Sequence, residues 1–243
     1  MIKVIVNGAK GNMGKEAVIA VNSDNELKLV AETDIGDDLM KKIKETGADV
    51  VVDFTHPSSA VENAKAIIMS GARPVIGTTG FTDGDIIELK KIAKEKNIGG
   101  LIAPNFAIGA VLMMNFSKEA AKYMPNVEII EIHHDKKADS PSGTAIKTAQ
   151  LISENRGEAS PVNIKTEEKV LGVRGGVKNE VHIHSIRIPG VVANQEVIFG
   201  GLGQTLTIKH DTINRQAFMP GVIIAIKKVI EINELVYGLE KIL

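Results

Sequence analysis

The N-terminal part of the chain alternates short apolar runs with segments of helical periodicity. The apolar runs are rich in β-branched residues and lie at 2–7, 26–34, 48–54 and 74–80. Each run ends in small or polar residues, and the segments that follow residues 14 and 57 space their apolar side chains as an amphipathic helix does. Apolar strands that alternate with helices predict a parallel sheet in the α/β class.

The pattern changes after Asn105. Residues 113–124 have helical character, and strand-like segments then dominate through residue 210. The clearest of these segments are 127–132, 181–188, 196–199 and 205–210. They alternate well enough for an open sheet with one covered face. Residues 215–232 are again expected to be helical, so we predict a boundary between two domains near Phe106.

A glycine-rich turn links the first predicted strand to the first predicted helix. Its glycines Gly8, Gly11 and Gly14 follow the spacing G-x-x-G-x-x-G, a variant of the dinucleotide-binding fingerprint. Gly8 would permit the tight turn, and Gly11 would let the backbone approach a pyrophosphate at the helix N-terminus. Asp34 follows about twenty residues later, where a ribose-binding carboxylate belongs. These features favour a Rossmann-like unit over an unrelated βαβ unit, and Glu16 excludes a P-loop, which needs Ser or Thr there.

The densest cluster of chemically active residues lies at 131–145, between a predicted strand and a predicted helix that starts after Ser140 or Ser142. The first amide groups of that helix lack intrahelical partners, so Gly143 and Thr144 could bind a carboxylate. Lys137 adds a cationic donor, and His133 is suited to proton transfer near neutral pH. Together they predict a pocket for a small anionic substrate that needs a proton.

Other interpretations of these histidines stay open. A solvated or core histidine pair is the commoner arrangement, and a metal site is a second alternative. Against a metal, neighbouring histidines on an extended strand point to opposite faces, and neither cysteine nor a helical zinc spacing occurs. His182 and His184 share one strand face without a third ligand, so we expect a structural or interfacial role there and predict no metal.

Composition narrows the classes of function. With 243 residues, 44% of them hydrophobic, the chain can build a substantial core. The formal net charge of −1 offers no basic field for nucleic acid, and the absence of cysteine excludes disulfides and thiol nucleophiles. The N-terminus lacks the apolar region of a signal peptide, and no run approaches the roughly 18 apolar residues of a membrane span. We therefore expect neither membrane nor nucleic acid as a partner, and a cytoplasmic location.

Segment 131–145, Glu-Ile-His-His-Asp-Lys-Lys-Ala-Asp-Ser-Pro-Ser-Gly-Thr-Ala, resembles the signature of the 4-hydroxy-tetrahydrodipicolinate (dihydrodipicolinate) reductase family. Segments 53–57, 77–81 and 103–109 resemble the same family. The resemblance implies that His133 is the catalytic proton donor and Lys137 a second catalytic donor. The implied substrate contacts are His134, Gly143 and Thr144. The cofactor contacts expected from the fingerprint and the resemblance are Gly8, Ala9, Lys10, Gly11, Asn12, Met13, Asp34, Gly77, Thr78, Thr79, Ala103, Pro104, Asn105 and Phe106.

The resemblance also implies the organisation of the chain. Residues 1–106 would form the dinucleotide-binding domain, which the C-terminal helical segment 215–243 rejoins. Residues 107–214 would form an α+β domain for substrate binding and oligomerisation, whose open mixed sheet pairs between subunits of a homotetramer. This chain departs from the family pattern in the loop after Arg187, where it carries Gln195 in place of a histidine.

The activity implied is the NAD(P)H-dependent reduction of 4-hydroxy-tetrahydrodipicolinate to tetrahydrodipicolinate in lysine and diaminopimelate biosynthesis. NADH is the favoured cofactor, because Asp34 would repel a 2′-phosphate and Ile35 stands where family members that favour NADPH tend to carry arginine. The alternatives are a related amino-acid dehydrogenase and a non-catalytic redox sensor that binds a dinucleotide. A sensor should lack the convergent His133, Lys137 and helix N-terminus, so the sequence favours an enzyme.

Overall fold

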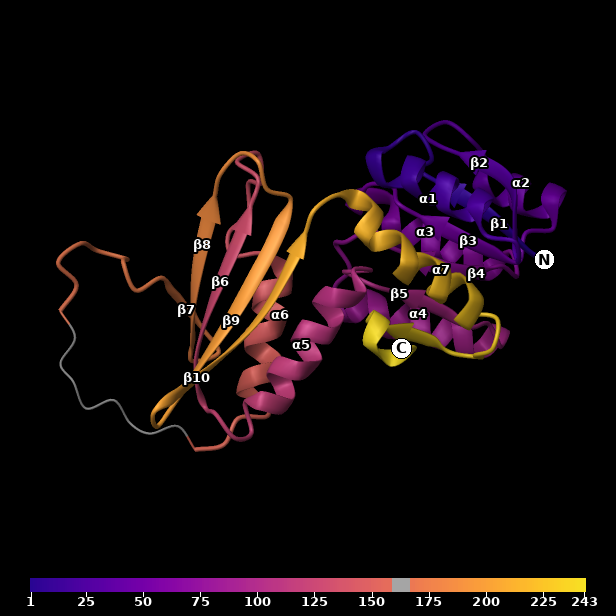
Figure 1. Ribbon diagram of the computed structural model, residues 1–243. Coiled ribbons are helices and arrows are strands. Elements are labelled where there is room, and N and C mark those ends of the chain that lie inside the picture. Colours follow the sequence, from indigo (N-terminus) through magenta and orange to yellow (C-terminus); the bar gives the residue numbers. More distant parts are fainter. Residues whose placement is uncertain (159–166) are drawn as a thin grey trace. The chain divides into compact units, whose positions relative to one another are not determined.

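The chain forms two compact units in the computed structural model, which describes residues 1–158 and 167–243. The first unit comprises Met1–Ile108 and Arg215–Leu243, and the second comprises Gly109–Asn214 (Figure 1). Residues 159–166 belong to the stretch in which strands are predicted to dominate, and they lie outside the described residues.

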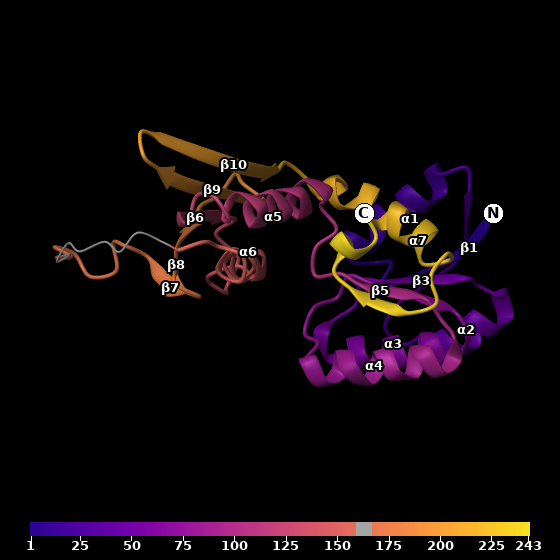
Figure 2. The ribbon, with the colours of Figure 1, turned by 90° about the horizontal axis from the view of Figure 1, so that it is seen from below.

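The first unit is built on a six-stranded parallel sheet with the order β11-β5-β4-β3-β1-β2. Its strands are β1 (Ile2–Asn7), β2 (Leu27–Thr33), β3 (Val50–Asp53), β4 (Arg73–Ile76), β5 (Gly100–Ile102) and β11 (Leu235–Tyr237). Its helices are α1 (Asn12–Ser23), α2 (Leu39–Thr46), α3 (Pro57–Met69), α4 (Asp83–Lys96) and α7 (Met219–Lys228), with 3₁₀ turns η1 (Arg215–Phe218) and η2 (Leu239–Lys241). Figure 2 shows α1 and α7 on one face of the sheet and α3 and α4 on the other.

Helices on both faces explain why the central strands are uniformly apolar. Residues 4–6 of β1 and 50–52 of β3 are fully buried, as expected for parallel strands that are covered on both sides. The helix ends also follow from local sequence. Thr82 and Asp85 form a capping box at the start of α4, and Asn97 ends this helix in the left-handed conformation. The predicted Rossmann-like architecture is confirmed.

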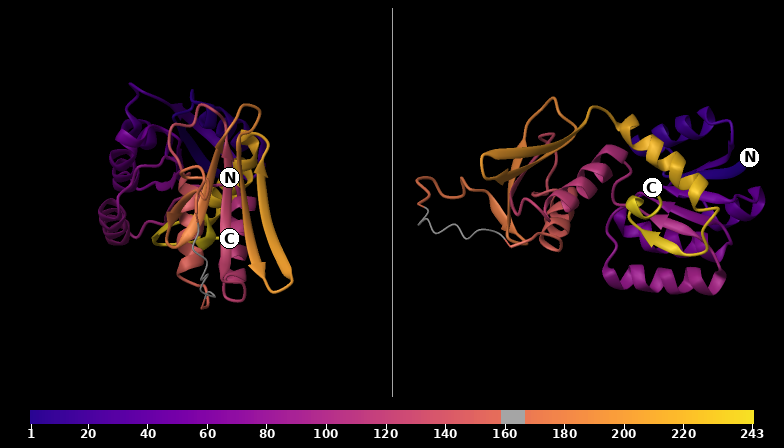
Figure 3. Two further views of the ribbon diagram at one scale, coloured as in Figure 1. Left: turned by 90° about the vertical axis from the view of Figure 1, so that its left-hand side faces the viewer. Right: turned by 60° about the horizontal axis from the view of Figure 1, so that its bottom comes forward.

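The C-terminal segment differs from the helix predicted over 215–243. Its α-helix covers only Met219–Lys228, and Leu235–Tyr237 forms β11, which pairs in parallel with β5 (Figure 3, right). A three-residue strand is too short to show alternation, and it forms because β5 offers an open edge. The helix predicted at 113–124 is also displaced, because α5 runs from Ile108 to Ala120.

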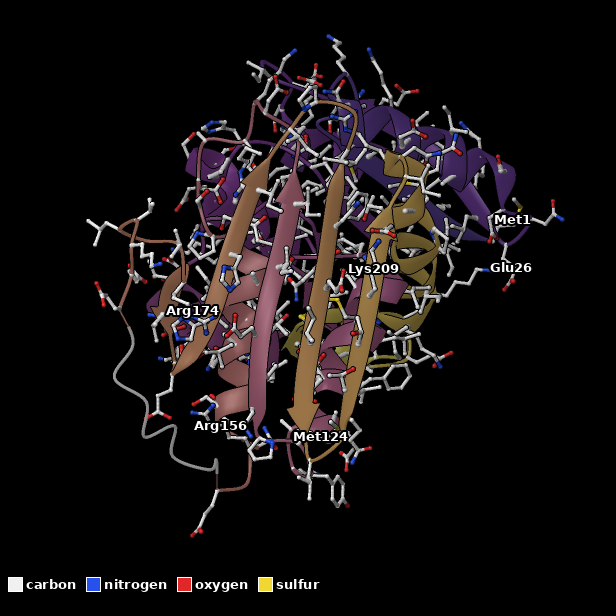
Figure 4. All side chains as sticks on the ribbon, turned by 60° about the vertical axis from the view of Figure 1, so that its left-hand side comes forward. Met1, Glu26, Met124, Arg156, Arg174 and Lys209 are labelled. Atoms are coloured by element: carbon white, nitrogen blue, oxygen red, sulfur yellow. The ribbon has the colours of Figure 1, made fainter. Side chains whose placement is uncertain are left out.

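The second unit contains a five-stranded mixed sheet with the order β10-β9-β6-β8-β7. Its strands are β6 (Asn126–His133), β7 (Gly176–Lys178), β8 (Val181–Arg187), β9 (Ala193–Gly201) and β10 (Gln204–Thr212). Only β6 and β8 pair in parallel, and α5 and α6 (Gly143–Ser153) lie on one face. Figure 4 looks onto the other face, with both helices behind the strands. This confirms the predicted open mixed sheet with one covered face.

Candidate active site

The predicted cofactor residues of the first unit gather at one edge of the parallel sheet. Gly8 follows β1, Asp34 follows β2, Gly77 follows β4 and Ala103 follows β5. Because parallel strands end at the same edge, these positions share the side on which open α/β sheets bind ligands. The loop after β3 lies at the same edge. Segments that are far apart in sequence are therefore neighbours there.

Two of the three fingerprint glycines are required by the packing of the chain itself. Gly8 has a φ of +78°, and a Cβ there would lie 2.5 Å from the carbonyl oxygen of Phe54. A Cβ on Gly14 would lie 2.0 Å from the carbonyl oxygen of Gly8. Gly11 is different, because it is exposed at the N-cap of α1 and a Cβ would approach the Gly8 oxygen only to 3.2 Å. Room above Gly11 suits the approach of a pyrophosphate to the helix N-terminus.

A pocket of about 370 Å³ opens beside this turn. Among the predicted residues, Gly8, Gly11 and Asp34 line it. Ile35, expected to bear on cofactor choice, and Phe54, Thr55 and His56 of the family-like segment 53–57 also line it. The residues not predicted from the sequence are Asn7, Gly36, Asp37, Leu39, Ser59 and Asn63. The position of residues 54–56 directly after a buried strand was the sequence signal that could have identified them as pocket residues. The glycine turn, the acidic residue after β2 and this volume together fit a dinucleotide.

Asp34 is held as an anion at the rim of this pocket. Its carboxylate accepts hydrogen bonds from the backbone N–H of Ile35 at 2.9 Å and of Lys10 at 2.8 Å. These bonds, first the one from Ile35, lower the pKa of the Asp34 carboxyl below its usual range. The neighbouring Ile35 side chain is 98% exposed and brings no positive charge to the rim.

A buried aspartate, Asp53, connects the ends of three strands and is not among the site residues predicted from the sequence. Asp53 accepts hydrogen bonds from Asn7 at 2.7 Å, Thr78 at 2.8 Å and Asn63 at 2.9 Å. Thr78 is buried and its hydroxyl holds the Asp53 carboxylate in place, whereas its neighbour Thr79 is exposed at the edge. The network fixes the loops that follow β1, β3 and β4.

Phe54 and Phe106 close the apolar part of the same edge. Their rings meet edge to face with centroids 5.9 Å apart. A Cβ on Gly77 would lie 2.1 Å from the Phe54 ring, so this glycine makes room for the aromatic contact. Of the predicted residues after β5, Ala103 and Phe106 are buried, while Pro104 is exposed.

In the second unit, the predicted anion site lies at the start of α6. Ser142 is the N-cap, and its hydroxyl accepts a hydrogen bond from the Ala145 N–H at 3.2 Å. Gly143 is exposed as the first helical residue, and a Cβ there would meet no atom within 4 Å. The carbonyl of Thr144 accepts a hydrogen bond from Thr148 at 2.8 Å. The space over the first turn is therefore open to a ligand.

His133 ends β6 and is bound to a buried carboxylate. Its Nδ1 lies 2.5 Å from Glu131, which is fully buried. Arg187 binds the two oxygens of Glu131 at 2.8 and 2.9 Å, and the Ser142 N–H donates to it at 3.3 Å. Burial alone would raise the pKa of Glu131, but hydrogen bonds from His133, Arg187 and Ser185 outweigh it and lower the pKa from 4.5 to about 2.

Lys137 lies on the turn that follows the two histidines. Its backbone N–H donates to the carbonyl of His134 at 3.1 Å, and its ammonium group binds Asp139 at 2.7 Å. The ion pair, first through this hydrogen bond from Lys137, lowers the pKa of Asp139. The carbonyl of Asp139 accepts a hydrogen bond from Arg187 at 2.8 Å, so the turn is fastened to the Glu131 cluster.

Two comparisons of sequence with known proteins decide the family. Models described as the N-terminus and the C-terminus of dihydrodipicolinate reductase match residues 2–106 and 109–243. The chain belongs to the dihydrodipicolinate reductase family. Proteins named 4-hydroxy-tetrahydrodipicolinate reductase are 50% identical in Syntrophomonas wolfei, covering 99% of this chain and 98% of that protein. In Coxiella burnetii the identity is 52%, with 100% of this chain and 99% of the relative covered.

A solved structure of the dihydrodipicolinate reductase family has the same fold. The dipicolinate-bound dihydrodipicolinate reductase from Paenisporosarcina sp. TG-14 is 42% identical, with a TM-score of 0.91 and full coverage of both chains. Membership confirms the predicted family, fold class and class of activity, an NAD(P)H-dependent oxidoreductase. It also decides against the amino-acid dehydrogenase and the non-catalytic sensor.

Three remaining features of this reductase family member bear on the predictions. Within 1–158 and 167–243 no group of three or more His, Asp or Glu residues is arranged to hold a metal ion. Gln195 is buried and its side-chain amide donates to the Thr148 hydroxyl at 2.8 Å. None of the helices in the described part of the chain combines the length and apolar character that crossing a bilayer requires.

Proposed function

We propose that the chain reduces 4-hydroxy-tetrahydrodipicolinate to tetrahydrodipicolinate with NAD(P)H. At residue level, this proposal rests on one carboxylate that binds two parts of the site. Glu131 binds both the His133 ring and the backbone N–H of Ser142 at the start of α6. A proton donor and an anion-binding helix terminus are thereby held together in one unit, as a dicarboxylate substrate that needs a proton requires.

The residues of the second unit divide the work between them. The first turn of α6, with Gly143 and Thr144, would bind a substrate carboxylate, and Lys137 would place a positive charge against the bound anion. His134 would contribute a further contact. His133 would donate a proton through Nε2, because Nδ1 is engaged by Glu131. The bound dinucleotide supplies the hydride.

The activity is tested by mixing the chain with NADH and freshly prepared 4-hydroxy-tetrahydrodipicolinate. We expect NADH to be oxidised in proportion to the substrate added, with tetrahydrodipicolinate as the product. Dipicolinate, the ligand of the Paenisporosarcina structure, should compete with the substrate and leave dinucleotide binding unchanged. An absence of NADH and NADPH oxidation would contradict the proposal.

Replacing Gly143 by valine should raise KM for the substrate about tenfold or more and change kcat less. A Cβ at this position meets no protein atom within 4 Å, so the fold should persist while the approach of a carboxylate to the helix terminus is obstructed. The matched control is Gly84→Val, because Gly84 lies in the first turn of α4 and a Cβ there would make only an ordinary contact, with the Thr82 hydroxyl at 3.7 Å. Unchanged saturation in Gly143→Val would remove the anion site from the account.

We further propose that NADH gives a higher kcat/KM than NADPH, although both are used. The anionic Asp34 would bind the ribose hydroxyls and repel a 2′-phosphate. Lys10 and Lys15 lie near the predicted phosphate path and should attract the extra phosphate at low salt. Because charges are screened over roughly 8 Å at physiological ionic strength, the relative use of NADPH should fall as salt is raised.

Comparing the two cofactors at two ionic strengths measures this directly. Asp34→Asn serves as the matched variant, since it keeps the shape of the side chain while removing the charge that repels the phosphate. It should improve the use of NADPH relative to NADH. A strong preference for NADPH that salt does not alter would show that Asp34 lacks this role.

Assembly and location complete the proposal. We assign a homotetramer, supported by the helix-free face of the second sheet, which offers a broad surface for pairing between copies (Figure 4). We assign a cytoplasmic location, supported by the use of a reduced dinucleotide that is regenerated inside the cell. Light scattering measures the assembled mass against the 26.0 kDa of one chain.

A further inference from the structure

We propose that Glu131 is a positioning residue for proton transfer, which holds the His133 ring with Nδ1 as the donor so that Nε2 faces the substrate. This inference rests on the proposed function, in which His133 gives the proton. Glu131 touches neither reacting molecule in this scheme and acts through the histidine. The Arg187 guanidinium completes the arrangement by holding the carboxylate in place.

The strand geometry puts these groups together. Glu131 and His133 are two residues apart on β6 and therefore point to the same face, which is the face covered by α6. Parallel pairing of β6 with β8 sets Glu131 beside Ser185 and His133 beside Arg187. The side chains of Ser185 and Arg187 both hydrogen-bond to the Glu131 carboxylate.

The charge of Glu131 determines which ring nitrogen carries the proton. Its two oxygens face only donors in the contacts described: His133 on β6, Arg187 and Ser185 on β8, and the Ser142 N–H before α6. An ionised carboxylate can only accept, so at 2.5 Å the Nδ1 of His133 must donate. The nearby charged groups of Lys137 and Asp139 form an ion pair with each other. Their contact with the Glu131 cluster is the hydrogen bond from Arg187 to the backbone carbonyl of Asp139.

This arrangement makes the proton transfer a step between defined atoms. The substrate first loses its hydroxyl group and a proton from the neighbouring carbon as water, which leaves a conjugated imine to accept the hydride. The imidazolium has protons on both nitrogens, and the Nε2–H bond breaks as the proton forms a bond to substrate carbon. The bonding pair stays on Nε2, and the negative carbon centre that the hydride addition creates is neutralised. The ring is left with its proton on Nδ1, still bound to Glu131, and solvent can restore the proton on Nε2. A carboxylate at Nδ1 thus favours one tautomer throughout.

Glu131→Gln tests this role, because the amide has the size of the carboxylate but lacks its charge. We expect kcat to fall about ten- to a hundredfold, the range found when the carboxylate partner of a metal-bound histidine is removed, with dinucleotide affinity nearly unchanged. The alkaline limb of the kcat profile should move to lower pH, because a neutral partner stabilises the imidazolium less. A residue with only a packing role would lower stability without moving that limb.

A double-mutant cycle separates action through His133 from any other effect. In the His133→Ala background, adding Glu131→Gln should produce little further loss of kcat, because the group that Glu131 positions is already absent. A loss that multiplies with that of His133→Ala would contradict the proposal. Glu131→Asp provides a second variant if the amide prevents folding, since it keeps the negative charge beside Arg187 while withdrawing the carboxylate by one methylene from His133.

The chain offers a matched control on the other face of the same strands. Glu128 of β6 binds His184 of β8 at 2.7 Å and also binds Arg174, which reproduces the Glu, His and Arg set away from the proposed site (Figure 4, where Arg174 is labelled). Glu128→Gln should lower thermal stability less than Glu131→Gln, because the Glu128 side chain is partly exposed, and it should leave the shape of the pH profile unchanged.

The outcomes distinguish this inference from the function on which it rests. If His133→Ala loses turnover while Glu131→Gln and Glu131→Asp keep both kcat and the pH profile, the positioning role is wrong and the function stands. If His133→Ala itself keeps wild-type turnover, the proposed proton donor is wrong. A shifted alkaline limb in Glu131→Gln, absent in Glu128→Gln and accompanied by non-additivity with His133→Ala, supports the inference.

Discussion

Replacing His133 by alanine should lower kcat by roughly a hundredfold or more, as expected when a positioned proton donor is removed. The affinity for dinucleotide should barely change, because the residues predicted to bind it belong to the first unit and His133 to the second. Glu131 keeps its salt bridge with Arg187 in this variant, so the buried carboxylate is not left without a partner.

The measurement is steady-state turnover together with a fluorescence titration of NADH. The titration is the internal control, since a misfolded variant would lose cofactor binding as well as turnover. His133→Gln is a useful second variant, because its amide can still donate a hydrogen bond but cannot deliver a proton at neutral pH. It should be as inactive as the alanine variant. Near-wild-type turnover in either one would contradict the assignment of His133 as the donor.

Replacing Lys137 by alanine should also lower kcat by roughly a hundredfold or more. The ammonium group is expected to stabilise negative charge on the reacting molecule, and the neighbouring Arg187 guanidinium is already engaged by Glu131. Asp139 would lose its ion-pair partner in this variant, which adds a repulsive charge near the anion site. The effect should therefore appear in KM as well as in kcat.

The adjacent Lys136 provides the control for this experiment. It has the same charge and lies in the same turn, but it is exposed and has no assigned role in the proposed site. Lys136→Ala should retain turnover close to that of the wild type, whereas Lys137→Ala should not. The double variant Lys137→Ala with Asp139→Asn removes the unpaired carboxylate and should recover part of KM without restoring kcat. Equal losses of kcat in both lysine variants would show that Lys137 acts only through general electrostatic attraction of the substrate.

Local sequence sufficed for most of the fold. Strands β1 to β4 of the first sheet lie in the four short apolar runs, and such runs are readily recognised when they alternate with helices, whereas the three-residue strand β5 was not predicted. The start of α6 was predictable from Ser142, whose hydroxyl caps the helix as its residue type suggests. In contrast, β11 was missed because its three residues form a strand only through pairing with β5, which is distant in the sequence.

The reactive residues of the candidate site could be predicted from the sequence, but the residues that hold them in place could not. His133 and Lys137 stood out because they occur in a short segment with a helix start. The contact between Glu131 and Arg187 joins residues 56 positions apart, and it depends on the parallel register of β6 and β8. The two-residue spacing of Glu131 and His133 was the available signal. The Asp53 network was hidden for the same reason, because its partners arrive from three strand ends.

Transfer of isotope from the cofactor tests the central claim most directly. The chain is incubated with NADH deuterated at both hydrogens of nicotinamide C4 and with freshly prepared 4-hydroxy-tetrahydrodipicolinate, and the product is analysed by mass spectrometry. If the chain is the proposed reductase, tetrahydrodipicolinate should carry one deuterium on carbon, and the amount formed should equal the NADH consumed. Unlabelled tetrahydrodipicolinate, or unchanged substrate and NADH, would contradict the account.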